Sequence, residues 1–189
     1  MSAHLISTFD GSIRRSGWVR FLVLGLLILV LSGCSVTVPK DIEVVRPFDV
    51  QRYLGQWYEI ARLDHSFERN MNQVSATYSL NDDGSIKVIN RGFDTQRQRW
   101  NEAVGRAEFV LGPDQGALRV SFFGPFYGGY FITALDQVNY QWAMVVGPDL
   151  KYFWILSREK SLTSDVKEKL LAQAEAMGIV LDEIIWVEQ

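Results

Sequence analysis

The sequence predicts an all-β domain: an eight-stranded antiparallel up-and-down barrel with one C-terminal α-helix packed outside it and a short ninth strand. Three observations predict this fold. Short apolar and aromatic segments follow one another at nearly regular spacing. Their connections are short, which favours pairing between strands that are neighbours in sequence. A single amphipathic segment comes after them. Closing the strands into a barrel removes the edges that an open sheet would expose.

The strands are expected where apolar segments lie between turn residues. Residues 81–84, with the sequence NDDG, are a strong hairpin signal, and the GPD tripeptides at 112–114 and 147–149 mark two further turns. The segments expected as strands are 56–62, 73–80, 85–93, 99–111, 116–124, 130–136, 140–147 and 151–158. A barrel of eight strands encloses an interior that can hold one small ligand.

One helix is expected after the eighth strand. Ser164 is a suitable N-cap for the segment that follows it, and Gly178 is a suitable C′ residue. Apolar residues recur at helical spacing on one stripe, which indicates a surface helix packed against an apolar face. That stripe holds Val166, Leu170, Ala174 and Met177. A last strand is expected at 183–188.

Composition excludes several classes of function. The chain has 189 residues, of which 48% are hydrophobic and 13% aromatic, and its net charge is −3. A negative net charge gives no electrostatic reason to expect nucleic acid as a partner. The single cysteine excludes an intramolecular disulfide and zinc sites built from cysteine clusters. We predict no metal site and no cofactor.

The first 33 residues are typical of a signal peptide. Arg14, Arg15 and Arg20 precede an apolar run over 21–31. That run is too short for a helix to span a bilayer about 30 Å thick, which takes about 20 residues, but it suits a signal-peptide core. The sequence LSGC at 31–34 follows directly and resembles the lipobox of bacterial lipoproteins. The alternative is an uncleaved signal anchor with a coincidental cysteine.

The lipobox resemblance implies that the chain is cut before Cys34 and that this cysteine is lipidated. Buried acyl CH₂ groups then hold the protein to a membrane at about 0.8 kcal/mol each. Ser35 stands where an Asp would resemble an inner-membrane retention signal, which favours the outer membrane and its periplasmic side. Residues 34–52 contain two prolines and show no sustained period, so we expect a lipidated tether able to reach roughly 60 Å. The folded domain is then expected over 53–189.

Three short motifs point to one family. The sequence GQWY begins at Gly55 and carries Trp57, ALDQVNY carries Asp136 and Tyr140, and WILSR ends at Arg158. In this order they resemble the three signatures of lipocalins. The resemblance implies that Trp57 and Arg158 pack together and close one end of the barrel, because a flat guanidinium can stack on an indole and still donate to carbonyl groups.

Further segments narrow the resemblance. SFFGPFYGGY at 121–130, GPD at 147–149 and IIWV at 184–187 are similar to the bacterial outer-membrane lipocalins, which resemble apolipoprotein D. This implies a membrane-anchored protein that binds and stores or transports lipids in the cell envelope, with a role in membrane maintenance under stress. The competing hypothesis is a structural envelope lipoprotein whose barrel is filled and binds nothing.

Alternation along the strands predicts the inner face of the barrel. Small, aliphatic and aromatic residues dominate it, which suits an acyl chain. No inward Lys or Arg is evident, which favours a lysophospholipid with its head at the mouth over a clamped fatty acid. A bulge would change this parity, and Gly92 and Gly105 are places where one could occur. The residues predicted to contact lipid are Ala76, Tyr78, Val88, Asn90, Ala103, Val120, Phe122, Tyr130, Ile132, Ala143, Tyr152 and Trp154. Ala134 is also expected to point inward.

Catalysis is not expected. Apart from His4 in the signal, the only histidine is His65, which with Glu68 is expected in a solvated loop at the barrel mouth. No Ser-His-Asp set, metal cluster or phosphate loop is visible. Phe126 and Tyr127, between glycines, are expected at an exposed tip that contacts a membrane or, in a homodimer, a second copy of the chain.

Overall fold

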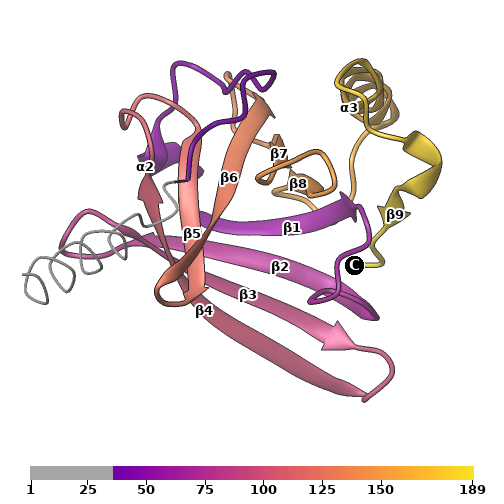
Figure 1. Ribbon diagram of the computed structural model, residues 1–189. Coiled ribbons are helices and arrows are strands. Elements are labelled where there is room, and N and C mark those ends of the chain that lie inside the picture. Colours follow the sequence, from indigo (N-terminus) through magenta and orange to yellow (C-terminus); the bar gives the residue numbers. More distant parts are fainter. Residues whose placement is uncertain (1–35) are drawn as a thin grey trace, which may run out of the picture. The chain divides into compact units, whose positions relative to one another are not determined.

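The computed structural model describes residues 36–189, which form one compact unit. The predicted signal peptide over 1–33 and the predicted lipidation at Cys34 lie outside the described residues. In the described part, consecutive strands pair antiparallel and β1 pairs with both β8 and β2, so the sheet closes on itself (Figure 1). The predicted up-and-down barrel is therefore confirmed. No helix within this part of the chain is long and apolar enough to cross a membrane.

The barrel strands agree closely with the predicted segments. They are β1 (Gly55–Arg62), β2 (Met71–Leu80), β3 (Ile86–Asp94), β4 (Arg99–Phe109), β5 (Ala117–Phe123), β6 (Phe126–Leu135), β7 (Trp142–Val146) and β8 (Phe153–Ser157). The largest difference is that β6 begins at Phe126 and not at Tyr130. Gly124 and Pro125 make a tight turn, so Phe123 already faces Phe126 across the hairpin.

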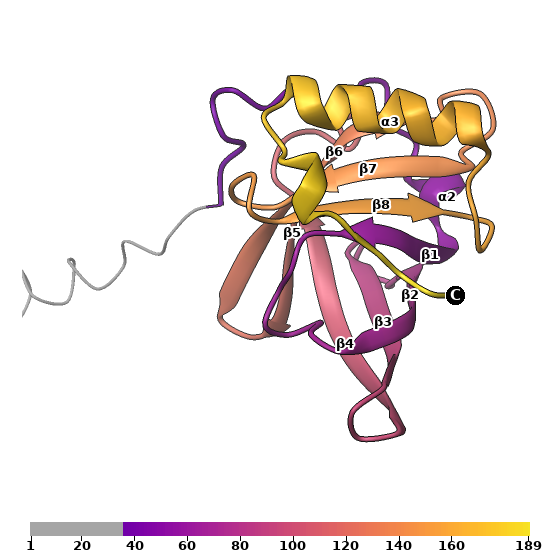
Figure 2. The ribbon, with the colours of Figure 1, turned by 90° about the vertical axis from the view of Figure 1, so that its right-hand side faces the viewer.

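The remaining elements are α2 (Val50–Tyr53), α3 (Ser164–Ala176), η1 (Leu181–Glu183) and the short strand β9 (Ile185–Trp186). Helix α3 lies outside the barrel along β6, β7 and β8 (Figure 2), with Leu170 and Ala174 buried. Its N-cap is Thr163 and not Ser164, because Thr163 keeps the extended backbone of a cap while Ser164 is already helical. Gly178 follows the helix with φ +95°, as a C′ glycine should.

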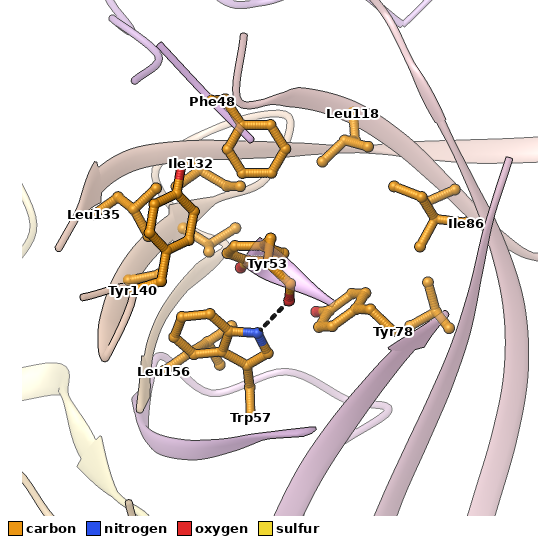
Figure 3. Close-up of a cluster of buried hydrophobic side chains, with 14 residues drawn as sticks. Phe48, Tyr53, Trp57, Tyr78, Ile86, Leu118, Ile132, Leu135, Tyr140 and Leu156 are labelled. Atoms are coloured by element: carbon orange, nitrogen blue, oxygen red, sulfur yellow. Dashed lines mark hydrogen bonds between the residues drawn. The ribbon is translucent and has the colours of Figure 1, made fainter. Parts of the chain in front are cut away.

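The domain has two hydrophobic cores. The first lies inside the barrel and contains Phe48, Tyr53, Trp57 and Tyr140 (Figure 3). The second lies between the outer face of the barrel and α3 and includes Phe131 and Phe153. In β6 to β8, inward-pointing residues meet the first core and outward-pointing residues meet the second. This explains why the sequences of these strands are almost continuously apolar.

Bulges occur where the sequence did not indicate them. The register between β3 and β4 runs without a break past Gly92 and Gly105, so neither glycine marks a bulge in this pair of strands. Register shifts occur instead in four other strands: β1 (59–61), β2 (72–75), β5 (120–123) and β6 (132–134). The shift in β6 moves Ala134 from the predicted inner face to the outer core.

The C-terminal residues close the seam between β1 and β2, whose own pairing covers only Gly55–Tyr58. Val187 donates its backbone N–H to Ile60, and Gln73 donates to Glu188. The side-chain amide of Gln189 donates to the carbonyls of Glu59 and Val74. Residues 187–189 thus bond to both strands where the direct pairing has stopped.

Residues 36–49 are packed against the domain. Val36, Val38, Ile42 and Val44 contact the outer core. The backbone N–H of Val45 donates to Ile132 at 2.8 Å, Gly116 donates to Val45 at 3.0 Å, and Phe48 donates to Asp114 at 2.8 Å. The prediction of a free tether is therefore wrong for the described residues of that segment. Valine and isoleucine residues at close spacing supply enough apolar surface to hold it down.

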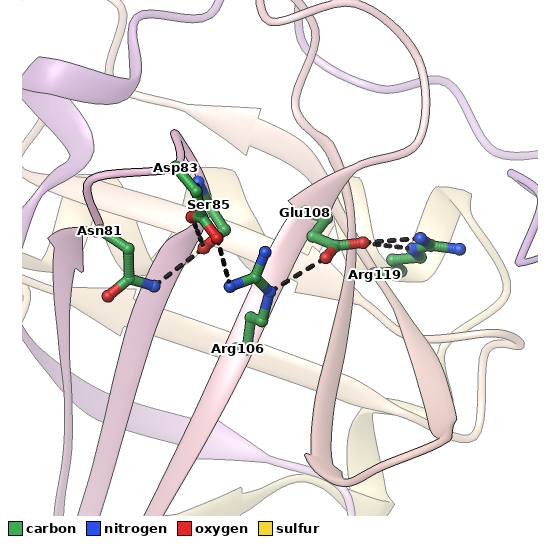
Figure 4. A network of polar contacts seen from close by, with 6 residues as sticks. All are labelled: Asn81, Asp83, Ser85, Arg106, Glu108 and Arg119. Atoms are coloured by element: carbon green, nitrogen blue, oxygen red, sulfur yellow. Dashed lines mark hydrogen bonds and ion pairs between the residues drawn. The ribbon is translucent and has the colours of Figure 1, made fainter.

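An exposed polar network joins the turn after β2 to β4 and β5 (Figure 4). Arg106 contacts Asp83 at 2.8 Å and Glu108 at 3.0 Å, and Arg119 contacts Glu108 at 2.6 Å. The network lies at the point where β4 and β5 pair, which they do only over Arg106–Phe109. Beyond it the two strands diverge (Figure 2), so Arg99–Gly105 has no partner strand on that side among the described residues.

Candidate functional site

The barrel encloses a cavity of about 670 Å³. Most of its wall is apolar, and it extends from Tyr53 and Ile86 in the interior to Phe67 and Pro148 in the loops of the open end. Ten of the residues predicted to contact lipid line this cavity: Ala76, Tyr78, Val88, Asn90, Ala103, Val120, Phe122, Tyr130, Tyr152 and Trp154. Ile132 and Ala143 point inward as predicted but lie in the packed inner core and not in the cavity wall.

Four charged residues of the cavity wall were not predicted: Glu59, Glu68, Glu102 and Arg91. Glu59 and Glu68 form a cluster with Arg62, which lies beside them. Arg62 is buried and donates to Glu59 at 2.9 Å and to the carbonyl of Glu68 at 3.0 Å. Alternation from Trp57 would have placed Glu59 on the inner face. Arg62 could not be found in that way, because the bulge in β1 lies between it and Trp57.

The electrostatics of this cluster limit its ligands. Burial, followed by the charge of Glu68, holds the pKa of Glu59 well above its usual range, although Arg62 opposes the shift. Burial also raises the pKa of Glu68, whose carboxylate accepts a hydrogen bond from the Trp154 indole at 3.0 Å. The single guanidinium is already paired with a carboxylate. The cluster therefore offers no unpaired guanidinium to a ligand carboxylate, and the basic residue of the cavity wall is Arg91, which lies outside the cluster.

Three phenols form a chain in the interior. The hydroxyl of Tyr130 lies 2.7 Å from that of Tyr53 and 2.9 Å from that of Tyr78. Burial raises the pKa of all three groups, so they stay neutral at physiological pH. Tyr78 and Tyr130 were predicted in the wall, but Tyr53 was missed because it lies in α2 and not in a strand. The three hydroxyls thus satisfy one another in a part of the interior that is mostly apolar.

His65 is not in a solvated loop. Its side chain is stacked between Phe67, with ring centroids 5.3 Å apart, and Tyr152, at 5.0 Å, and the residue is only 4% exposed. Burial and the nearby Arg62 lower its pKa, so the ring is neutral near pH 7. Glu68, predicted in the same solvated loop, is half-buried and faces the cavity. Aromatic neighbours that are distant in sequence cause both differences.

The end of the barrel opposite to the mouth is closed by Trp57 and Arg158. The guanidinium lies 3.9 Å from the centroid of the Trp57 ring. It donates to the carbonyls of Gln56, Arg52 and Leu54, each at 2.8 Å, and to that of Tyr140 at 3.3 Å. Trp57 in turn donates its indole N–H to the carbonyl of Tyr53 (Figure 3).

The other predicted motif residues surround this pair. Gly55 has φ +92°, and an added Cβ would lie 3.3 Å from the Arg158 guanidinium, so the position favours glycine on both counts. The Asp136 carboxylate accepts hydrogen bonds from the backbone N–H groups of Val138 and Asn139, which fixes the turn between β6 and β7. The Tyr140 hydroxyl accepts a hydrogen bond from the Asp49 backbone.

An eight-stranded barrel with an external helix, an apolar interior and this tryptophan-arginine closure defines a lipocalin. The family model of the lipocalin-like domain matches residues 48–189, and the chain belongs to that family. Members of the family are in general binding and transport proteins. Among residues 36–189, no group of three or more His, Cys, Asp or Glu side chains is placed to hold a metal ion.

The chain is similar to several outer-membrane lipoproteins. Outer membrane lipoprotein Blc of Citrobacter freundii is 51% identical over 161 residues, which cover 85% of this chain and 90% of the relative. Its namesake in Vibrio cholerae is 43% identical over 171 residues, or 90% and 99% of the two chains. Apolipoprotein D of Mus musculus is 31% identical over 151 residues, or 75% and 77%. These relatives agree with the outer-membrane location that the sequence predicts.

Solved structures confirm the fold. The allergen Per a 4 from cockroaches superposes with a TM-score of 0.64 at 22% identity, covering 83% of this chain and 96% of that chain. Insecticyanin from Manduca sexta superposes with a TM-score of 0.62 at 24% identity, covering 81% and 86%. At these identities the likeness concerns the fold alone.

Proposed function

We propose that the mature protein is a lipid-anchored lipocalin of the outer membrane that binds a single-chain lipid and stores or carries it in the cell envelope. The observation that carries the proposal is the cavity of about 670 Å³, which has the size and apolar lining of a small-molecule site. A structural lipoprotein with a filled barrel would need no such space. A role in membrane maintenance under stress follows from the resemblance to the bacterial lipocalins.

The anchor is the lipidated thiol of Cys34, exposed after removal of residues 1–33. The relatives that carry the name of outer membrane lipoproteins support this part of the proposal. Mass spectrometry of the protein from membranes tests it. A mature chain beginning at Cys34 with acyl mass is expected, and an unmodified cysteine would contradict the anchor.

A lysophospholipid is favoured over a free fatty acid. Among the described residues that line the cavity, the acidic ones are Glu59, Glu68 and Glu102 and the only basic one is Arg91. The nearby Arg62 already contacts Glu59. At Glu59 and Glu68 burial raises the pKa of both carboxyl groups, so a further carboxylate beside them would be unfavourable. A zwitterionic head brings its own cation and can remain near the open end. Binding, and not catalysis, is the function that these groups support.

Titration of the protein with lysophosphatidylethanolamine and with oleate tests this function. Trp154 lines the cavity and should report binding by its fluorescence. We expect saturable one-to-one binding, tighter for the lysophospholipid. Ala103→Trp fills the cavity and should abolish binding, whereas Val104→Trp, on the adjacent exposed position outside the cavity lining, should not. Absence of saturable binding in the folded parent protein would favour the structural alternative.

A further inference from the structure

The packed N-terminal segment restricts where the anchor can be. Since Val36 already contacts the domain, only Ser35 separates it from Cys34. Two residues of extended chain span at most about 7 Å. Figure 2 shows that the described chain begins on the side of the barrel from which the turn between β5 and β6 projects, opposite to α2. An anchored protein therefore cannot move far from the bilayer, and its open-end side is the one held near the bilayer.

Exposed aromatic side chains are gathered at the same end. Phe123 and Phe126 face each other at the turn between β5 and β6 and are 81% and 77% exposed. Phe67, from the loop between β1 and β2, is also exposed, and all three side chains border the cavity. The whole stretch 120–130 carries no charged residue. A bilayer could therefore receive this turn without burying a charge.

In the part of the chain that the structure describes, the wall beside this turn lacks strand pairing. Residues Arg99–Gly105 of β4 lack a β5 partner among the described residues, and Ala103 on one side and Phe122 on the other both line the cavity. Here the wall is closed by side chains and not by backbone hydrogen bonds, and the ring of Phe122 lies against Gly105. A movement of Phe122 would let an acyl chain pass between β4 and β5 in contact with apolar side chains.

We propose that the anchored protein lies with its open end on the bilayer and its Phe123–Phe126 turn inserted among the acyl chains, so that a single-chain lipid passes between membrane and cavity where β4 and β5 are not paired. This arrangement rests on the proposed anchor and lipid ligand. The bilayer is the occupant that the short anchor favours, because the anchor holds the apolar turn beside it. A second copy of the chain is the competing occupant.

The test uses the full lipidated protein, reconstituted in vesicles of phosphatidylethanolamine with a minor share of phosphatidylglycerol. Phe126→Cys and Val138→Cys each carry an environment-sensitive fluorophore. Val138 is the matched control, because it is also 77% exposed but lies in the turn between β6 and β7 at the closed end. We expect a blue-shifted emission that lipid-borne quenchers reduce at position 126, and water-like emission without quenching at position 138.

The other outcomes overturn the proposal. Water-like emission at both positions refutes the orientation. A blue shift at position 126 that depends on protein density and is insensitive to lipid-borne quenchers assigns the turn to a second copy. Labelling of the parent protein would instead show that the Cys34 thiol is free, and the titration described above tests ligand binding separately. The experiments therefore distinguish an incorrect anchor, an incorrect ligand and an incorrect orientation from one another.

A transfer assay adds a functional measure. The double variant Phe123→Ser with Phe126→Ser should take up a fluorescent lysophospholipid from the vesicles about tenfold more slowly, or slower still, because two aromatic side chains no longer enter the bilayer. This loss should exceed any change in affinity for the same lipid dispersed in solution. Val138→Ser should transfer at the parent rate. If the transfer rate and the affinity in solution fell by the same factor, insertion of the turn would be contradicted.

Discussion

Removing the Arg158 side chain should destabilise the domain by about 3 kcal/mol. Arg158→Ala deletes the stacking on Trp57, which contributes about 1–2 kcal/mol when partly desolvated. It also deletes hydrogen bonds to four carbonyls, three of them at 2.8 Å. Water can reach some of these carbonyls, so about 0.5 kcal/mol each is a reasonable net value. For a domain of this size, the melting temperature should fall by about 6–12 °C.

Thermal unfolding followed by circular dichroism measures this change. Arg106→Ala is the matched control. The Arg106 guanidinium likewise makes polar contacts, in this case with two carboxylates, but it lies on the exposed surface (Figure 4), where such pairs contribute about 0–1 kcal/mol. Arg158→Lys keeps the charge and loses the planar fork, so an intermediate effect is expected. A melting temperature for Arg158→Ala no lower than that of Arg106→Ala would refute the proposed role of the closure.

Three further predictions concern the cavity wall. Tyr130→Phe leaves two buried phenols without their shared partner and should cost about 1–3 kcal/mol in urea unfolding; an unchanged midpoint would show that the hydroxyl chain contributes nothing. The pKa of Glu59 is raised above its ordinary value of 4.5, so the folded state keeps a proton that the unfolded chain releases, and stability falls as pH rises above that value. Glu68→Gln removes the neighbouring carboxylate, and the fall in stability as pH rises should become shallower; parallel profiles would contradict the coupling. Gly105→Ala would place its Cβ 2.7 Å from a phenylalanine ring and should cost about 1–3 kcal/mol, whereas Gly128→Ala meets nothing within 4 Å and should be neutral in the same unfolding assay.

The sequence predicted the parts of the fold that depend on local patterns. Alternating segments and turn residues located the barrel strands, and three short motifs located the closure of one barrel end. The prediction of a tether was wrong for residues 36–49. Their sequence has no regular period, but their valines pack on a surface formed by distant parts of the chain, which the local pattern does not reveal. His65 was wrong for a similar reason, since the rings that cover it are mostly far away in sequence.

The candidate site was predictable to the extent that alternation persists. Residues on β2 to β5 lie in the cavity wall as expected, because the register shifts near Asn72 in β2 and before Phe123 in β5 leave the predicted positions on the inner face. Ala134 follows a register shift and lies on the opposite face. Side chains contributed by α2 and by the loop after β1, such as Tyr53 and Glu68, follow no strand period at all. Their place in the cavity depends on tertiary packing, which the local sequence does not encode.

The seam between β1 and β2 has a consequence for the order of folding. The Gln189 amide reaches carbonyls that lie 130 and 115 positions earlier in the chain, one on each strand. Contacts at such separation form late, because a long loop must close before they can be made. A chain emerging from a translocation channel with its N-terminus first can pair β1 with β2 early, but β8 and residues 187–189 must arrive before the barrel is sealed. Until then the sheet is not closed, and a lipid could enter the future cavity from the side before the wall is complete.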